Sequence, residues 1–229
     1  MAERKARAQV SFGSQRRALQ LLEGTGPSQS RIRDSPSVWM AAALIVVYLV
    51  FGILGGDLID LNIFSVAFFF VQVNELVWEG WVWMLFTAMF LHANLVHLAG
   101  NVFFLLIFGT SLEEQVSRTR WLVTYFASGL AGNLVFLFIG PLLDEPPIAL
   151  GASGAVYGLL GAAGGLKGAV LVILFAGLNI FAGGGVLAHV GGLLVGLTLR
   201  QWGDNLASLF GLGPSRSEEL SDSAQSIGS

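Results

Sequence analysis

Long apolar runs, separated by short polar stretches, dominate the chain between residues 38 and 202. Measured against a bilayer hydrocarbon core of about 30 Å, or about 20 helical residues, these runs predict six membrane-spanning helices. The spans are expected at residues 38–56, 83–109, 120–140, 152–166, 168–183 and 186–202. The segment 57–82 is interrupted by polar residues, and its apolar run 63–71 is too short to cross a bilayer. This segment is therefore predicted to be interfacial or re-entrant.

Composition supports a membrane protein. Of 229 residues, 54% are hydrophobic and only 12% are charged, and the mean hydropathy is +0.71. A soluble domain could not cover that much apolar surface, so the fold class is an all-α polytopic membrane protein with one domain at 38–202. The polar segments 1–37 and 203–229 are predicted to be a mostly disordered basic arm and a polar tail. The chain has no cysteine, which excludes disulfides and thiolate sites.

The charges partition with respect to the six spans. With both termini on one side, all twelve lysine and arginine residues fall on that side. The opposite side holds only acidic residues, which are Asp57, Asp60, Glu75, Glu79, Asp144 and Glu145. By the positive-inside rule, both termini are predicted to be cytoplasmic. The sequence indicates no nucleic-acid partner.

Polar residues inside the second predicted span are candidates for function, because such groups are costly at that depth. His97 and Asn101 lie four residues apart and share a helix face. Both side chains can donate hydrogen bonds, and two converging donors suit a developing oxyanion. His92 lies five residues before His97 and is expected to point away from it, toward the outer end or a loop.

The fourth predicted span opens with a serine between glycines, in the run Gly151-Ala-Ser153-Gly154. A serine at a helix start is most often a cap. The glycines also allow close backbone approach, and the free amides of a helix start can hold an oxyanion, so both interpretations are compatible. Counting back fourteen residues from Lys167 places the hydroxyl about 10 Å below the outer edge of the membrane core.

Two stripes of glycine favour close packing of the fourth and sixth spans. The stripe of the fourth span leaves one helix face without side chains and consists of Gly154, Gly158, Gly161 and Gly165. The stripe of the sixth span begins with a histidine and consists of His189, Gly192 and Gly196. If the stripes face each other, Ser153 and His189 lie at similar depth, which is the geometry for base-activated nucleophilic attack. Tyr157, one turn below Ser153, could pack on the imidazole. A zinc site is disfavoured because no HExxH motif occurs.

Taken together, these motifs resemble those of the rhomboid intramembrane serine proteases. The matching residues are His92-x4-His97-x3-Asn101, Gly151-x-Ser153-Gly154 with Tyr157, and Ala188-His189-x2-Gly192-x3-Gly196. The resemblance covers about residues 38–202 and implies a six-helix rhomboid core whose first loop, 57–82, is embedded in the membrane.

The resemblance also implies roles. Ser153 would be the nucleophile, His189 the general base and then acid, and the Ser153 amide with His97 and Asn101 the oxyanion hole. Tyr157 would stack on His189, with Gly151, Gly154, Gly192 and Gly196 as supporting residues. His92 and Glu113 would be structural, with Glu113 ordering the inner ends of spans two and three. Many relatives carry Trp-Arg at the end of the first loop, where this chain has Trp83-Met84.

The predicted activity is endopeptidase cleavage of single-span membrane proteins near the extracytoplasmic side, without cofactor or metal. The protein is expected to be an integral, multi-pass protein of the plasma membrane of a prokaryote. Two alternatives stay open. One is a non-catalytic relative that binds transmembrane helices, which usually lacks the serine or the histidine. The other is a small transporter, for which internal repeat symmetry is expected and is not evident.

Overall fold

The computed structural model describes residues 34–62, 65, 67–164 and 185–209, with side chains through residue 203. The chain divides into two compact units, Met1–Ser35 and Pro36–Ser229, and the second carries all the elements described below. Within it, the long helices are α3 (Pro36–Gly55), α7 (Leu95–Glu113), α8 (Arg118–Ile139) and α10 (Val186–Leu209). Residues 153–164 form a further helix, here called the serine helix.

Three helices among the described residues are long and apolar enough to cross a membrane. They are Pro36–Gly55, Leu95–Glu113 and Arg118–Leu143, and they correspond to the first three predicted spans, with a later start for the second. The predicted span 168–183 lies outside the described residues, as do the last residues of 152–166. The count of six spans therefore stays a prediction. The helix α10 continues to Leu209, past the predicted end at residue 202, and the helix-breaking residues Gly211, Gly213 and Pro214 come only after it in the sequence.

The second predicted span begins later than hydropathy alone suggests. Residues 83–94 form a short helix α6 (Met84–Thr87), a 3-10 turn η1 (Ala88–Phe90) and a loop, before α7 starts at Leu95. Asn94 is the N-cap of α7, where its backbone is extended and its side-chain oxygen accepts a hydrogen bond from the His97 amide at 2.8 Å. A capping residue inside an apolar run interrupts the helix without lowering the average hydropathy much.

The segment 57–82 is tied to the rest of the molecule by backbone pairing. Strand β1 (Gln72–Val73) pairs antiparallel with β2 (Ile148–Ala149), just before the serine helix. A short helix, α5 (Asn74–Trp78), follows β1. The Asp57 carboxylate accepts hydrogen bonds from the amides of Ile59 and Asp60, which lower the pKa of that carboxyl.

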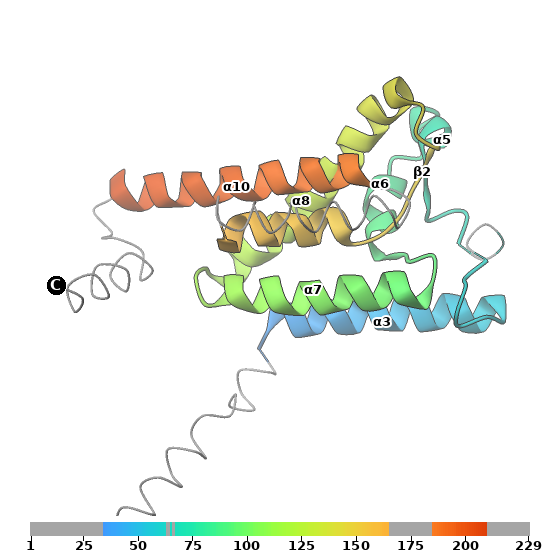
Figure 1. Ribbon diagram of the computed structural model, residues 1–229, viewed down its shortest axis with the longest axis horizontal. Helices are drawn as coiled ribbons and strands as arrows, with labels where there is room; N and C mark the ends of the chain where they lie inside the picture. The colour runs from blue at the N-terminus through green and yellow to red at the C-terminus, as the bar shows by residue number, and fades with distance from the viewer. Residues whose placement is uncertain (1–33, 63–64, 66, 165–184, 210–229) are drawn as a thin grey trace, which may run out of the picture. The chain divides into compact units, whose positions relative to one another are not determined.

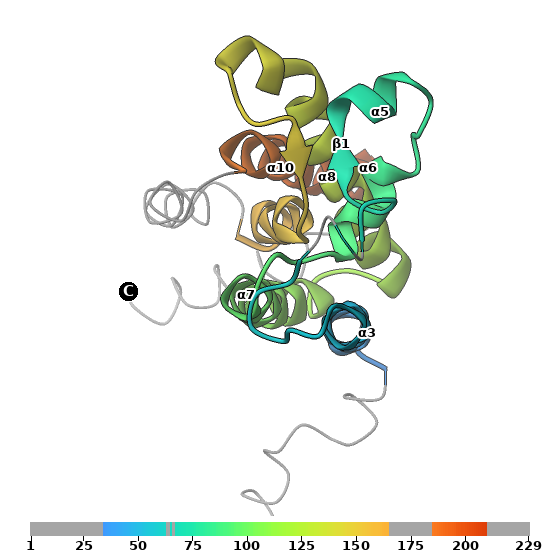
Figure 2. The same ribbon diagram turned by 90° about the vertical axis from the view of Figure 1, so that its right-hand side faces the viewer.

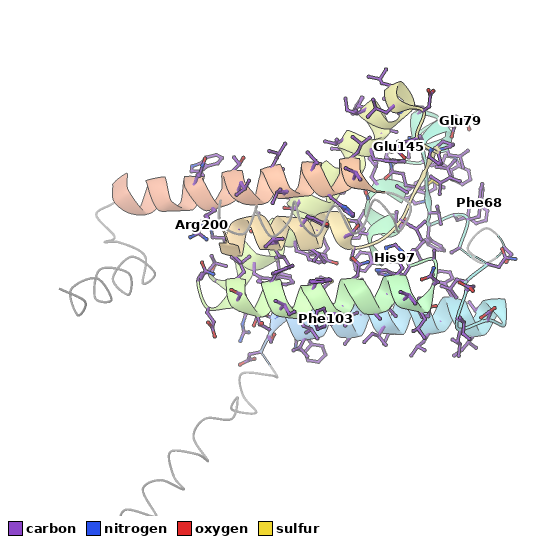
Figure 3. All side chains as sticks on the ribbon, in the orientation of Figure 1. Phe68, Glu79, His97, Phe103, Glu145 and Arg200 are labelled. Atoms are coloured by element: carbon purple, nitrogen blue, oxygen red, sulfur yellow. The ribbon has the colours of Figure 1, made fainter. Side chains whose placement is uncertain are left out.

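The serine helix lies at the centre of the second unit. Figures 1 and 2 both place it between α7 and α10, with α3 on the far side of α7. The apolar core joins α3, α7, α8 and the serine helix, and it includes the fully buried Leu44, Leu105, Trp121 and Leu159. In Figure 3, His97 lies at the same end of the bundle as Glu79 and Glu145, whereas Arg200 lies at the opposite end. This arrangement agrees with the charge partition predicted from the sequence.

Candidate active site

His97 and Asn101 project from the first turns of α7 into a cavity. Asn101 is buried, and its amide nitrogen donates one hydrogen bond to the His97 carbonyl oxygen at 3.0 Å. A carboxamide nitrogen carries two hydrogens, so the second remains for another acceptor. The shared helix face predicted from the four-residue spacing is therefore present, and the two side chains line one cavity.

Ser153 is brought next to His97 by a glycine that no other residue replaces easily. Gly151 has φ +122°, a conformation that side chains rarely adopt. A Cβ built on Gly151 would lie 2.9 Å from His97 Nε2 and 3.9 Å from Ser153 Oγ. The serine hydroxyl and the imidazole of His97 thus both lie within 4 Å of the Cβ position of Gly151. That position is empty because glycine has no side chain.

His189 lies in the first turns of α10 and is 5% exposed. Its ring stacks on Tyr157 of the serine helix, with ring centroids 4.2 Å apart and an interplanar angle of 14°. This contact is the one expected from the position of Tyr157 one turn below Ser153. Stacking on a fixed aromatic ring restricts the rotation of the imidazole, so His189 is held with its ring edge available to the cavity.

The two glycine stripes face each other, as their spacing predicts. A Cβ on Gly192 would overlap the Gly154 carbonyl oxygen, and a Cβ on Gly196 would overlap the Gly158 carbonyl oxygen. The serine helix and α10 therefore pack backbone against backbone, which brings Tyr157 and His189 together. Gly165, the fourth glycine of the first stripe, lies outside the described residues.

One cavity of about 850 Å³ gathers the candidate residues, namely His97, Asn101, Gly151, Ser153, Tyr157 and His189. Its volume is within the range of about 300–1,000 Å³ that is typical of ligand pockets. Much of the remaining lining is apolar and comes from Phe104, Phe136, Val156 and Leu160. The cavity thus combines a hydroxyl, two imidazoles and a carboxamide with walls that suit an apolar peptide segment.

Sequence reasoning missed Gly185 as part of this cavity. Gly185 has φ +90°, and a Cβ on it would lie 3.3 Å from His189 Nε2. Its carbonyl oxygen accepts the His189 amide at 2.9 Å. The signal that could have found it is the run of three glycines directly before α10, since a glycine next to a buried ring often serves a close approach.

The expectation that His92 points away from His97 was wrong. The two rings meet edge to face, with centroids 5.0 Å apart, and His92 is fully buried. The five-residue argument assumed a continuous helix, but α7 begins at Leu95, so the loop turns His92 back onto His97. Within the described part of the chain, no group of three His, Cys, Asp or Glu side chains that could hold a metal ion is found.

Glu113 connects α7 to α3, a contact that the sequence did not predict. Its carboxylate accepts a hydrogen bond from the Ser37 amide at 2.8 Å, in the first turn of α3. A carboxylate at a helix N-terminus satisfies a free amide and interacts favourably with the helix dipole. Glu113 therefore joins the start of α3 to the end of α7, and its expected role at the inner ends of the second and third spans stays a prediction.

The Trp83-Met84 pair is anchored without an arginine. The Trp83 indole donates to the Phe69 carbonyl oxygen at 3.0 Å and stacks on Trp81 at 5.3 Å. Met84 is fully buried and packs with Val77 and Leu137. The described end of the first loop is thus held by an indole hydrogen bond and apolar packing.

Replacing Gly151 by alanine is expected to lower activity by a factor of about 100. The methyl group would press on His97, and a misplacement of about 1 Å near reacting groups can cost that much. The control is Gly80→Ala, because Gly80 also has a positive φ (+107°) but no atom of the described residues lies within 4 Å of its Cβ position. Activity assays and thermal unfolding of both variants test this prediction. Equal activity losses in the two variants would show that backbone strain, not the contact with His97, is responsible.

The fold and the cavity define a class: an integral membrane protein of packed apolar helices that encloses a serine and histidines in a cavity. Comparison with known families narrows this class. The Rhomboid domain model matches residues 79–202, which is more than half of the chain. The protein therefore belongs to the rhomboid family.

Individual relatives show the same relationship. The chain is 30% identical over 128 residues to Rhomboid-like protease 3 of Toxoplasma gondii, covering 56% of this chain and 47% of the relative. It is 34% identical over 122 residues to Rhomboid protease GluP of Bacillus subtilis, covering 53% of this chain and 22% of the relative. It is 41% identical over 92 residues to RHOMBOID-like protein 6, mitochondrial, of Arabidopsis thaliana, covering 40% and 27%. The matches span about a quarter to a half of these relatives.

Proposed function

We propose that the protein is an intramembrane serine endopeptidase that uses Ser153 and His189 as a catalytic dyad. The observation that carries this proposal is that both side chains line one cavity, with the His189 ring stacked on Tyr157 of the serine helix. Two of the relatives described above are named as proteases. Family membership alone leaves the non-catalytic alternative open, and the presence of both dyad residues in the cavity argues against it.

The chemistry follows from these groups. An imidazole nitrogen of His189 accepts the Ser153 hydroxyl proton while Oγ forms a bond to the substrate carbonyl carbon. The carbonyl oxygen becomes an oxyanion, for which the Ser153 amide, His97 and Asn101 are the proposed donors. The C–N bond then breaks, and His189 returns the proton to the leaving amine. In the second half, His189 takes a proton from water and the hydroxide oxygen forms a bond to the acyl carbon. The bond from that carbon to Ser153 Oγ then breaks, and His189 returns the proton to Oγ.

The apolar lining favours a substrate that is itself a membrane segment. In an α-helix the carbonyl groups are hydrogen-bonded and shielded, so a bound transmembrane helix must unwind locally before attack. Substrates with glycine, proline or small residues near the cut are therefore expected. The proposed partners are single-span membrane proteins and the surrounding lipid, and the mechanism uses no metal or cofactor.

The orientation is proposed from the charge distribution. Glu79 and Glu145 lie at the His97 end of the bundle and Arg200 at the other, which supports an extracytoplasmic cavity and cytoplasmic termini under the positive-inside rule. The embedded first loop and the six-span core are part of the same proposal. The relatives come from a plant, an apicomplexan and a bacterium, so they do not favour the prokaryotic plasma membrane expected from the sequence over other membranes.

Covalent labelling tests the proposal directly. The purified protein in liposomes is incubated with a fluorophosphonate, digested, and the adduct located by mass spectrometry. Modification of the peptide containing Ser153, and of no other serine, is expected because only an activated hydroxyl reacts at a useful rate. A heat-unfolded sample is the control and should remain unlabelled. The absence of an adduct on Ser153 in the folded protein would contradict the proposed activity and favour a protein that binds helices without cutting them.

A further inference from the structure

Three polar side chains form a cluster at the end of the bundle opposite the cavity. This cluster, here called the inner latch, consists of Gln115, Arg120 and Arg200. Arg200 Nη1 of α10 donates to the carbonyl oxygens of Ala162 and Ala163 in the serine helix, both at 2.8 Å. The same nitrogen lies 3.4 Å from Gln115 Oε1, just beyond the end of α7. Figure 3 places Arg200 beside this end of the serine helix.

Two further sets of contacts complete the latch. Gln115 Nε2 donates to the Ala163 carbonyl oxygen at 3.3 Å, so the segment just after α7 reaches the same carbonyl as Arg200. Arg120, at the start of α8, donates from Nη2 to the carbonyl oxygens of Leu199 and Arg200 at 2.9 and 3.4 Å. A Cβ on Gly203 would overlap the Arg120 guanidinium, so that group lies against the α10 backbone. The serine helix, α7, α8 and α10 are thus joined at one place.

The glycine stripes bring the serine helix and α10 close but do little to fix their relative height. Contacts between glycine backbones lack interlocking side chains, and weak dispersion contacts change little when helices slide slightly. Hydrogen bonds from a guanidinium to particular carbonyl oxygens are directional and stronger when one partner is charged. The Arg200 bonds join these two helices at particular atoms, away from the stacked Tyr157 and His189, and therefore constrain their axial register.

Axial register matters because the proposed dyad is divided between these two helices. One residue of sliding moves a helix by about 1.5 Å, and a misplacement of about 1 Å between reacting groups can cost about a hundredfold in rate. Arg200 lies eleven residues after His189, and Ala162 lies nine residues after Ser153. At a helical rise of about 1.5 Å per residue, the latch is about 15 Å from the dyad, so Arg200 cannot contact the substrate's reacting atoms.

We infer that Arg200 is a positioning residue, which sets the height of His189 relative to Ser153 by holding the carbonyls of Ala162 and Ala163. This inference rests on the proposed function. Removing the guanidinium should lower the rate of the chemical step and leave substrate binding unchanged, because the cavity walls are not altered. Lysine keeps the charge and can donate to the same carbonyls, and so it should restore part of the rate.

Steady-state kinetics in liposomes test the inference, with Arg200→Gln, Arg200→Lys and the control Arg118→Gln. Arg118 is exposed at the start of α8, so its replacement removes the same charge. For Arg200→Gln we expect kcat to fall about 10- to 100-fold with KM within twofold, and the rate of Ser153 labelling by fluorophosphonate to fall by the same factor. Arg200→Lys should recover at least a third of the loss on a logarithmic scale, and Arg118→Gln should match the wild type. An unchanged kcat in Arg200→Gln, or a loss explained entirely by a smaller folded fraction, would overturn the inference.

Disulfide trapping reads the register without depending on activity. The chain has no cysteine, so introduced pairs react without competition. Leu193 packs against the cluster that contains Leu160, which makes Leu160→Cys with Leu193→Cys the in-register pair and Leu160→Cys with Leu197→Cys the pair displaced by one turn. Adding Arg200→Gln should slow oxidation of the first pair and speed that of the second. Unchanged trapping rates would refute the positioning role, whereas a wild type that is neither labelled nor active would refute only the proposed function.

Discussion

Replacing Ser153 by alanine is expected to abolish cleavage of a transmembrane substrate, with kcat falling at least about a thousandfold. The hydroxyl is the proposed nucleophile, and alanine leaves the cavity walls intact. Replacing His189 by alanine should have a similar effect, since without a base the serine stays protonated and unreactive. Because the two residues act as a unit, the double variant should be little worse than either single variant.

The measurement uses purified wild type and variants in liposomes with a generic single-span substrate. Ser128→Ala is a suitable control, because Ser128 is a buried serine of α8 that is not among the residues lining the cavity. It should retain activity within a few-fold. Thermal unfolding of each variant separates loss of chemistry from loss of fold. Equal cleavage by wild type, Ser153→Ala and His189→Ala would end the catalytic assignment.

Replacing Gly192 by alanine should have the second largest effect, with activity falling about 100-fold or more. The added methyl would overlap the Gly154 carbonyl oxygen, so the serine helix and α10 must move apart. Forcing extra volume into a packed interface costs about 1–3 kcal/mol. Unlike the loss of Ser153 or His189, this change should reduce both the activity and the unfolding temperature.

The matched control is Gly164→Ala in the serine helix. Among the residues that the structure describes, its added methyl would meet only Leu160 Cδ1, at 3.7 Å, which is an ordinary contact. That variant should be as stable as the wild type or slightly more so, because alanine has the higher helix propensity. Activity and thermal unfolding are measured on both variants. A Gly192→Ala protein as active as Gly164→Ala would show that backbone contact at Gly192 is not required to place His189.

The packing of the site was predictable where it depended on periodicity. The shared face of His97 and Asn101 follows from their four-residue spacing on α7. The contact between the glycine stripes follows from the same helical repeat. Because that contact brings the serine helix and α10 together, Tyr157 stacks on His189. These features needed only the geometry of a straight helix and the tendency of small residues to allow close approach.

Other features could not be read from local patterns. The cap at Asn94 shortens the second predicted span and turns His92 onto His97, because one side-chain hydrogen bond overrides an apolar run. The bond from Ser37 to Glu113 joins residues 76 positions apart. No periodic signal encodes such a contact, since its formation depends on where two helix ends meet.

By itself the sequence determined that this is a membrane protein of apolar helices, and it supplied the serine, the histidines and the glycine stripes of one candidate site. Hydropathy and the helical repeat depend on residues that are close together in the chain, so both can be recognised from the sequence alone. Only the tertiary structure decided that Gly151 and Gly185 leave room beside the two imidazoles, and that Arg200 reaches the carbonyls of Ala162 and Ala163. Those contacts join residues far apart in the chain, and their geometry is set by how whole helices pack against one another.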